Sequence, residues 1–556
     1  MMNRRKRIAP IVRRLILCAL SLMIIGALTL ELSGCGWDIT TVFPKPAASR
    51  FEDPATCGAC HPTHFKEWQG SIMHYAAISP VFNAFELTVR KLTDGAFAPN
   101  GSTPNFCIQC HSPTGTFDDE LPDFIDDQNA MAAIRSLSPV NQQGLSCDFC
   151  HTVRGPDLDN SLLQDGIANR SVLFGPSDMK YGPIDAPTES AYHTSTGSDY
   201  LRSPEFCGSC HDVRIPVPDP VTGEPFQRLE NLFTEWKTGP YNSVNNPFGK
   251  IIRCQDCHMS LYPMEDPGVF PKMVVGVGID ATVRSHAIHA FTAVSIPFID
   301  DPRFPNGDTN AVDSFGFPRG QEQRRRQMLR AACTLTLVGT PGNIAPGASV
   351  IPIKVVVTNV GAGHRVPSGF SQERQVWVEL TVRDDAGLIY ESGYLHDKAH
   401  PETGEMTPDG RLHDEDLEDR HFTVDIDTLD THFEHGPDHN QRPAVNLGIM
   451  NFQNEFQRIH PDGSREPVIN PLLADHMNNS HSLDMLAPKI VPYDIPVPAR
   501  GIVGDIQVRV RLRYRAFPPE FLRVLAIREP QLVSEETVDM NTIVDMAEAA
   551  TTITVP

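Results

Sequence analysis

The sequence has little positive charge. It holds 47 lysines and arginines against 69 aspartates and glutamates, which gives a formal net charge of −22 at pH 7. An acidic chain of this kind is not expected to bind nucleic acid, or to bind an anionic lipid surface through its body. A well-solvated surface that also steers basic partners is the ordinary consequence.

The chain also lacks long amphipathic runs between residues 57 and 300. Pro, Gly, Ser and Asp are frequent there, so we expect short helices separated by irregular segments. At 556 residues the chain is too long for one hydrophobic core, and two or more domains are expected.

Cysteines are scarce outside one repeated pattern. Of the 13 cysteines, only Cys18, Cys35 and Cys333 lie elsewhere. The other ten form five copies of Cys-x-x-Cys-His, namely CGACH (57–61), CIQCH (107–111), CDFCH (147–151), CGSCH (207–211) and CQDCH (254–258). We expect Cys333, which precedes a strand-like run, to be a small buried hydrophobe.

This spacing is typical of covalent haem attachment. Two thiols three positions apart can form thioethers with the two vinyl groups of one haem, and the adjacent histidine then binds the iron. A zinc ribbon does not require a histidine after each second cysteine, and a disulfide framework has no use for one. The pattern therefore predicts five c-type haems held by Cys57, Cys60, Cys107, Cys110, Cys147, Cys150, Cys207, Cys210, Cys254 and Cys257. The predicted proximal iron ligands are His61, His111, His151, His211 and His258.

The N-terminus predicts export. Six basic residues within 3–14 precede an apolar run from Leu15 to Leu30, which is the layout of a secretory signal. The segment Leu32-Ser33-Gly34-Cys35 resembles the bacterial lipobox, which implies cleavage after residue 34 and lipidation of Cys35. An uncleaved membrane anchor is the alternative, although the run is slightly short for a span of ~20 residues.

Changes in composition suggest the domain layout. We expect a signal peptide at 1–34, a Pro-containing tether at 35–56, a five-haem domain at 57–300 and a linker at 301–345 that contains a helix at 321–333. Alternating Val-, Ile- and Thr-rich runs follow and predict an antiparallel β-sandwich at 346–556, with a long insertion at 397–500. The predicted strands are residues 348–360, 374–384, 387–395, 505–516 and 551–556.

Six stretches resemble a known family. They are CGACHPTHFKEWQGSIMH (57–74), SAYHTSTGSDYLRSPEFCGSCHDV (190–213), RCQDCHM (253–259), SHAIHAFTAV (285–294), NVGAGHRVPSG (359–369) and RLRYRAFPPEFLR (511–523). They resemble bacterial multihaem cytochromes c related to the tetrahaem cytochrome of ammonia oxidisers and to hydroxylamine oxidoreductase. More narrowly, they resemble exported multihaem cytochromes with a C-terminal β-sandwich. The resemblance covers about residues 50–556 and implies an α+β multidomain chain, mostly helical or irregular in its N-terminal haem domain.

The resemblance also implies second axial ligands for the irons, at His74, His193, His289 and His364. Ala293 stands where this family usually has glycine, so His286 remains an alternative to His289. His64 is a further candidate, and a surface or propionate-contacting histidine is its alternative. Physically, a distal ligand should come from sequence remote from its own motif, because the local chain already occupies the proximal side. His364 would then bring the sandwich onto the haem domain.

Two other clusters are weaker. His432, His435 and His439 could bind zinc or copper, but Gly436 and Pro437 break any helix there, and a solvated acidic loop is the preferred interpretation. The acidic run 118–127 lacks the order of an EF-hand and is also interpreted as a solvated loop.

These observations favour an electron carrier in the cell envelope. We expect redox partner proteins, a membrane contact through the lipid anchor, a location on the periplasmic or cell-surface side, and no nucleic acid. The alternative is an oxidoreductase that acts on a small nitrogen or sulfur compound at one haem with an open position. Two points oppose it: there is no Cys-x-x-Cys-Lys variant, and the histidine candidates nearly match the five haems.

Overall fold

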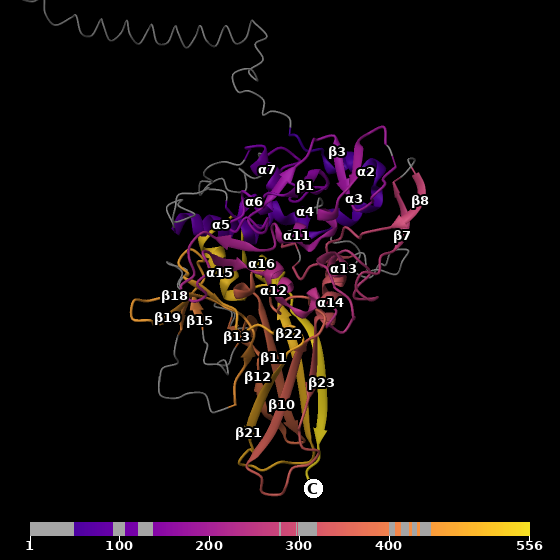
Figure 1. The fold of residues 1–556 in the computed structure, drawn as a ribbon. Coiled ribbons are helices and arrows are strands. Elements are labelled where there is room, and N and C mark those ends of the chain that lie inside the picture. Colours follow the sequence, from indigo (N-terminus) through magenta and orange to yellow (C-terminus); the bar gives the residue numbers. More distant parts are fainter. Residues whose placement is uncertain are drawn as a thin grey trace, which may run out of the picture. The chain divides into compact units, whose positions relative to one another are not determined.

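Short helices dominate the N-terminal half of the chain (Figure 1). The structure is a computed structural model that describes residues 49–92, 106–120, 137–188, 190–276, 280–295, 297–298, 320–399, 406–412, 422–424, 431–433 and 446–556. Residues Phe51–Pro556 form one compact unit. The helices of the N-terminal half are α2 (Pro54–Cys60), α3 (Pro62–Gln69), α4 (Ile72–Tyr75), α5 (Pro80–Leu92), α6 (Ile108–His111), α7 (Pro113–Phe117), α9 (Cys147–Thr152), α10 (Asp199–Arg202), α11 (Pro204–Gly208), α12 (Leu232–Thr238) and α13 (Cys254–His258).

Small two-stranded pairs lie between these helices. Three of them are antiparallel, and the pair β3–β4 is parallel. The strands are β1 (Val153–Pro156), β2 (Val172–Phe174), β3 (Met179–Gly182), β4 (Thr194–Gly197), β5 (Val213–Ile215), β6 (Gln227–Glu230), β7 (Lys272–Gly276) and β8 (Asp280–Ser285). The expectation of short helices and irregular segments is confirmed for the described residues, where the longest helix of this half, α5, has 13 residues.

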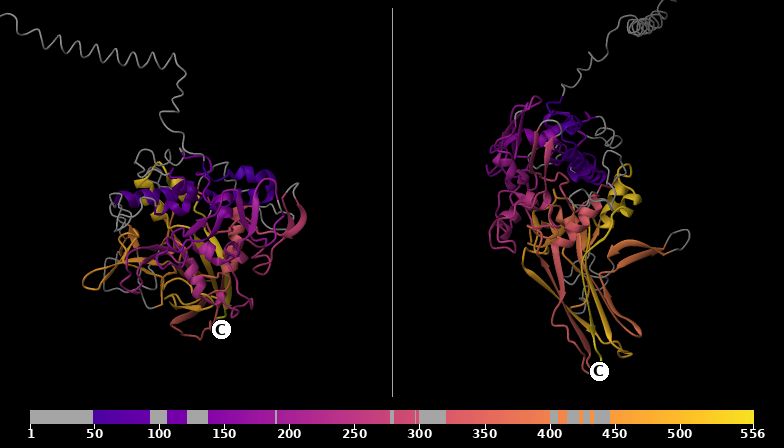
Figure 2. Two further views of the ribbon diagram at one scale, coloured as in Figure 1. Left: turned by 45° about the horizontal axis from the view of Figure 1, so that its top comes forward. Right: turned by 90° about the vertical axis from the view of Figure 1, so that its right-hand side faces the viewer.

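Two antiparallel sheets form most of the C-terminal half. One has the strand order β21-β10-β9, and the other has the order β12-β11-β22-β23, with β17 also pairing with β11. Their strands are β9 (Cys333–Leu337), β10 (Val350–Asn359), β11 (Gln375–Asp384), β12 (Gly387–Ser392), β17 (Met450–Asn451), β21 (Pro488–Pro496), β22 (Ile506–Arg515) and β23 (Val544–Ile553). The views in Figures 1 and 2 show the long strands side by side, with helices of the N-terminal half gathered near one end of them.

Alternation of apolar and polar residues explains the burial of these sheets. Along β10 every second residue from Ile351 to Val357 is fully buried, and the same holds from Ile506 to Leu512 along β22. A strand turns successive side chains to opposite faces, so one face of each sheet is apolar. The apolar residues of both sheets belong to one buried cluster, which also contains Cys333. The α+β class with antiparallel sheets is confirmed, while the sandwich arrangement itself stays a prediction.

Smaller elements surround the sheets. They are α14 (Gln321–Ala332), β13 (Leu395–Ala399), β14 (Met406–Leu412), β15 (Phe422–Val424), β16 (Thr431–Phe433), β18 (Glu455–Ile459), β19 (Arg465–Val468), β20 (His476–Asn478), α15 (Pro519–Arg528) and α16 (Glu535–Asp539). The helix expected at 321–333 is present as α14. The interval 397–500 differs from a simple insertion, because it includes β17 and β21, which are strands of the two large sheets.

Direct contacts join the two halves. The Nζ of Lys91 on α5 lies 2.6 Å from the carboxylate of Glu529, and the Nδ1 of His476 lies 2.9 Å from the carboxylate of Asp219. Backbone contacts add to these, since the hydroxyl of Tyr241 donates to the carbonyl of Val360. The expected boundary near residue 300 is therefore bridged by ion pairs and hydrogen bonds. None of the described helices combines the length and the apolar composition that a membrane span needs.

Candidate functional site

Each Cys-x-x-Cys-His motif lies on a short helix or on the turn that follows it. Residues three and four apart share a face of a helix, so the first cysteine lies on the same side as the second cysteine and the histidine in α9 and α13, which contain their whole motifs. Local capping starts two of these helices. The Asp53 carboxylate accepts a hydrogen bond from the N–H of Ala55 (2.9 Å), and the Ser146 hydroxyl accepts one from the N–H of Phe149 (3.3 Å). All ten cysteines have free thiols, as thioether attachment requires.

A backbone carbonyl fixes the ring of four of the five motif histidines. The Nδ1 donors and their carbonyl acceptors are His61 and Val275 (2.7 Å), His111 and Ala76 (3.3 Å), His151 and Tyr181 (2.7 Å), and His258 and Thr292 (2.6 Å). Because a carbonyl can only accept, Nδ1 carries the proton and Nε2 keeps its lone pair. This is the tautomer that binds a metal through Nε2. Among the described contacts, the ring of His211 has no such partner.

Burial favours the neutral form of four of the five motif histidines. It lowers the pKa of His111 and of His211 to about 4, and it also lowers the pKa values of His151 and His258. A neutral imidazole is the form that ligates a metal. These residues therefore fit a haem iron in their ordinary state at neutral pH.

The five motifs adjoin one another. Thiols of the first and third motifs (Cys57 and Cys147), of the second and fourth (Cys110 and Cys210), and of the fourth and fifth (Cys207 and Cys254) lie close enough to shift each other's pKa. The third and fourth motifs are also close, since Cys150 and Cys210 interact electrostatically. The five attachment points thus form one connected group.

His289 faces the third motif. Its ring centroid lies 6.2 Å from that of His151, and the two ring planes are 21° apart. Two imidazoles that bind opposite sides of one metal ion, with metal–nitrogen bonds of ~2 Å, have centroids roughly 6 Å apart. The Nδ1–H of His289 donates to the carbonyl of Ala287 (2.6 Å), which leaves Nε2 available. The geometry therefore fits His151 and His289 as an axial pair.

His286 is placed differently. Its Nε2 lies 2.8 and 2.9 Å from the two carboxylate oxygens of Glu67, and its Nδ1 lies 3.1 Å from the Nε2 of His64. Both ring nitrogens are engaged, so the geometry favours His289 over His286 as the ligand. Glu67 also accepts a hydrogen bond from the backbone N–H of His289 (2.9 Å) and so positions that residue. His64 retains one buried nitrogen, Nδ1, without a partner in the described structure, and its role stays a prediction.

His74 is held by its own segment. Its Nδ1–H donates to the carbonyl of Gln69 (2.9 Å), and its ring lies against the indole of Trp68, with a centroid distance of 3.9 Å. The indole N–H of Trp68 in turn donates to the carbonyl of Leu145, next to the third motif (2.8 Å). The Nε2 atom of His74 is thus oriented by a rigid, buried setting.

His364 lies beside the fourth and fifth motifs. Burial lowers its pKa to about 4, and His258 and His211 contribute to this lowering. Its Nδ1–H donates to the carbonyl of Arg365 (2.8 Å), which again leaves Nε2 available. A side chain added at Gly361 would meet the carbonyl oxygen of Ala331 at 2.0 Å, so this glycine permits a close approach to α14.

His193 is set apart from the other candidates. Its Nδ1 contacts the carbonyl of Thr194 (3.3 Å) and the hydroxyl of Ser195 (3.1 Å), next to β4. In the part of the chain that the structure describes, no proximal histidine is in contact with it. Its assignment as a ligand stays a prediction.

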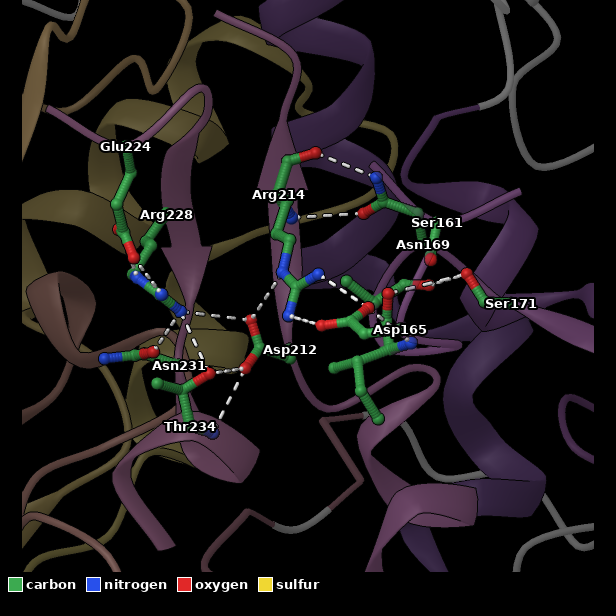
Figure 3. Close-up of polar contacts among 12 residues, drawn as sticks. Ser161, Asp165, Asn169, Ser171, Asp212, Arg214, Glu224, Arg228, Asn231 and Thr234 are labelled. Atoms are coloured by element: carbon green, nitrogen blue, oxygen red, sulfur yellow. Dashed lines mark hydrogen bonds and ion pairs between the residues drawn. The ribbon is translucent and has the colours of Figure 1, made fainter. Parts of the chain in front are cut away.

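A buried ion network supports the fourth motif (Figure 3). Asp212, which follows the motif directly, is fully buried and accepts a hydrogen bond from the N–H of Thr234 (3.1 Å). Arg228 reaches Asp212 at 3.5 Å, and Arg214 makes two hydrogen bonds of 3.0 Å with the carboxylate of Asp165. Burial raises the pKa of Asp212 despite these partners.

Several of these supporting groups could not be found from the sequence. The carbonyl acceptors on β3, β7 and the 290s segment have no sequence signature, because every residue has a carbonyl group. Glu67 could have been suspected, since it lies one helical turn from His64. Phe82, whose ring stacks on that of His111 at 3.5 Å and 5°, gives no signal.

Some predictions lie outside the described residues. These are the signal peptide at 1–34, lipidation at Cys35, most of the tether, residues 301–319 of the linker, residues 121–127 of the acidic run, and His435 and His439. In the described part of the chain, no group of three or more His, Cys, Asp and Glu side chains could hold a metal ion by itself. A haem iron needs only the axial positions from the protein, as described above.

Comparisons with known proteins agree with this chemistry. Residues 56–152, which contain the first three motifs, match the family described as "Cytochrome c554 and c-prime". No curated protein matches the chain. The structure is similar to a penta-heme cytochrome c552 from Thermochromatium tepidum, with a TM-score of 0.50 and 17% identity over 91% of this chain and 100% of that one. At this identity the likeness concerns the fold alone. Together with the family match, it supports a multihaem cytochrome c.

Proposed function

We propose that this protein carries electrons through five covalently bound haems, most of them with two histidine ligands. The observation that carries the proposal is the common state of the motif histidines. Four of the five have Nδ1 bound to a carbonyl and Nε2 available, and the ring of His289 faces that of His151 at 6.2 Å. When bound, a haem supplies an iron that alternates between the ferric and ferrous states.

The protein's own contribution is to hold the ligands. Carbonyl contacts fix the tautomer and direction of four of the five proximal rings, so that their coordination changes little when the charge of the iron changes. The contacts among the motifs bring the five attachment points together, as transfer along a chain of haems requires. The proposal has no need of a substrate pocket.

We further propose that the protein is exported and tethered by a lipid on Cys35. The basic and apolar N-terminal segments and the lipobox-like Leu32–Cys35 support this part. Its partners are then redox proteins of the cell envelope, with the membrane contact made through the lipid. The acidic composition supports basic partner surfaces and speaks against nucleic acid.

Spectroscopy of the holoprotein tests the proposal. If every haem has two histidine ligands, the oxidised protein is entirely low-spin and the reduced protein does not bind carbon monoxide. A majority of high-spin haems, or fewer than five haems per chain, would contradict it.

A second candidate function has one observation in its favour. Among the described residues, the only histidine that affects the pKa of His111 is His211. His211 is itself a candidate proximal ligand. Cys107 packs against an apolar cluster that includes Phe106, Phe456 and Met477, and the buried Glu86 and Arg90 also act on it. This favours an oxidoreductase with one open haem at 107–111 that acts on a small nitrogen or sulfur compound. A single high-spin haem that binds carbon monoxide, lost on replacement of His111, would favour this function over the carrier.

A further inference from the structure

Three consecutive residues before β2 have left-handed backbone. Ala168, Asn169 and Arg170 have φ values of 69°, 51° and 58°, and none of them is glycine. Such conformations are unfavourable for residues with a Cβ. A run of three persists only where the surrounding structure enforces it.

The fourth haem motif enforces this turn. The N–H of Ala168 donates to the carbonyl of Gly208 (2.9 Å), and the N–H of Arg170 donates to the carbonyl of Ser209 (2.7 Å). Gly208 and Ser209 are the two residues between the cysteines of that motif. The turn is therefore bound directly to the haem-attachment loop.

Side chains secure the turn from the other side (Figure 3). The amide of Asn169 donates to the carbonyl of Arg214 (2.8 Å) and accepts from its backbone N–H (3.1 Å). Arg214 is in turn held by two hydrogen bonds to Asp165, and the hydroxyl of Ser171 donates to the carbonyl of Ala168 (2.5 Å). The left-handed conformation is thus over-determined.

The turn brings one cation to the contact between two motifs. Arg170 interacts electrostatically with both Cys110 and Cys210, whose thiols adjoin each other. Its buried Nε has no hydrogen-bond partner in the described structure. Glu230, which is partly buried, is the opposing charge that acts on the same two thiols.

We propose that the Ala168–Arg170 turn positions the Arg170 guanidinium between the haems attached at 107–111 and 207–211, where its charge favours their ferrous form. This proposal rests on the proposed electron-transfer function and deepens it, because it identifies a residue that sets the potential of two neighbouring carriers. Each iron takes up one electron from a donor and gains no proton, so a fixed positive charge nearby stabilises the reduced state. Arg170 is a positioning and tuning residue and does not ligate the iron.

Arg170→Gln in the full-length holoprotein tests the proposal by spectroelectrochemical titration. At a fixed electrode potential, the ferric-to-ferrous ratio of the affected haems should rise about tenfold, the size expected for one charge at ~10 Å in a medium of effective dielectric constant ~20. Arg170→Lys retains the charge and should restore most of the shift. Arg383→Gln, at an exposed position on β11, is the matched control and should leave the titration unchanged.

Each outcome is decisive. Equal shifts in Arg170→Gln and Arg170→Lys would overturn the proposal, because shape rather than charge would then matter. An unchanged titration in Arg170→Gln would overturn it as well. If the wild-type protein loads no haems or shows no reversible reduction, the electron-transfer function itself fails. Reversible reduction of all haems with no effect of Arg170 removes only this inference.

Discussion

The motif histidines show how single side chains are prepared for their role. A hydrogen bond from Nδ1 to a carbonyl decides which nitrogen faces the cofactor, and burial removes the competing proton. Hydrogen-bond partners also distinguish two histidines that are only three residues apart. His289 has a free Nε2 opposite His151, whereas both nitrogens of His286 are bound to neighbours.

Replacing these two histidines gives a direct contrast. We expect His289→Ala to convert one haem to a high-spin form that binds carbon monoxide, because the iron held by His151 loses its second ligand. His286→Gln should keep every haem low-spin, since His286 contacts Glu67 and His64. Absorption spectra of the reduced proteins with carbon monoxide measure the difference. A high-spin haem in His286→Gln together with an unchanged His289→Ala would reverse the assignment.

Glu235 gives a pH prediction. Burial raises its pKa from 4.5 to about 7, even though its carboxylate accepts hydrogen bonds from the N–H of Arg365 (3.0 Å) and the hydroxyl of Ser368 (2.6 Å). The folded protein therefore holds more protons than the unfolded chain between these pH values. The stabilising contribution is complete below pH 4.5 and is lost as the pH rises through 7, with an upper limit of ~3 kcal/mol.

Glu235→Gln should abolish the loss of stability that accompanies deprotonation of Glu235 as the pH rises. We expect the melting temperature of the variant, relative to wild type, to be higher at pH 8 than at pH 5. The exposed Glu536→Gln is the matched control and should follow the wild type at both pH values. Parallel pH profiles for wild type and Glu235→Gln would show that the carboxylate does not titrate in this range.

The short helices carry the haem-attachment residues, and the long strands provide the main apolar core. The haem-binding helices are only a few residues long, so their stability must come from their packing contacts rather than from helix propensity. The long strands provide the largest apolar cluster. The loop between β10 and β11 carries His364 from that support to the motifs.

The sheets should tolerate truncation poorly on their inner face. Leu512 on β22 is completely buried, whereas Leu388 on β12 is 42% exposed. Leu512→Ala should lower the free energy of unfolding by ~3 kcal/mol, because it leaves a cavity. Leu388→Ala should change it by less than ~0.5 kcal/mol. Denaturant unfolding of both variants measures the contrast, and equal effects would argue against the described burial.

The loop that carries His364 depends on Gly361. Gly361→Ala would place a methyl group 2.0 Å from the carbonyl oxygen of Ala331 and 2.6 Å from the hydroxyl of Tyr262. We expect the loop to shift and the spectrum of one haem to change. Gly342→Ala, where the added carbon meets nothing within 4 Å, should leave the spectrum intact. A wild-type spectrum in Gly361→Ala would argue against His364 as an iron ligand.

Part of this organisation could be predicted from the sequence. The attachment residues of each motif lie within five consecutive positions, so each motif can be recognised in the sequence. Strands β10 and β22 alternate regularly and β11 alternates over its second half, and the predicted ranges agree with all three to within two residues at each end. The N-terminal part of β23, with Asp545 and Glu548 on its exposed side, lacks the usual β-rich composition.

Strand β21 was missed for a different reason. It contains Pro488, Pro492 and Pro496, which argue against a central strand. The structure accommodates it as the edge strand of its sheet, next to β10. Contacts such as Glu67 with His286, or Asn169 with Arg214, join residues far apart in the chain, and local patterns do not encode them.

The whole molecule brings these parts into one electron carrier. The five motifs span about 200 residues of sequence and yet adjoin one another in space. The C-terminal half packs against them and contributes His364. Under the proposed function, a single chain stores and passes five electrons through five haems.

Coulometric titration of the purified holoprotein measures this capacity. We expect that five one-electron equivalents are taken up per chain, that the uptake is reversible, and that five haems are counted in the same sample. Uptake of fewer than five electrons by protein that contains five haems, or a haem content below five, would contradict the proposed function.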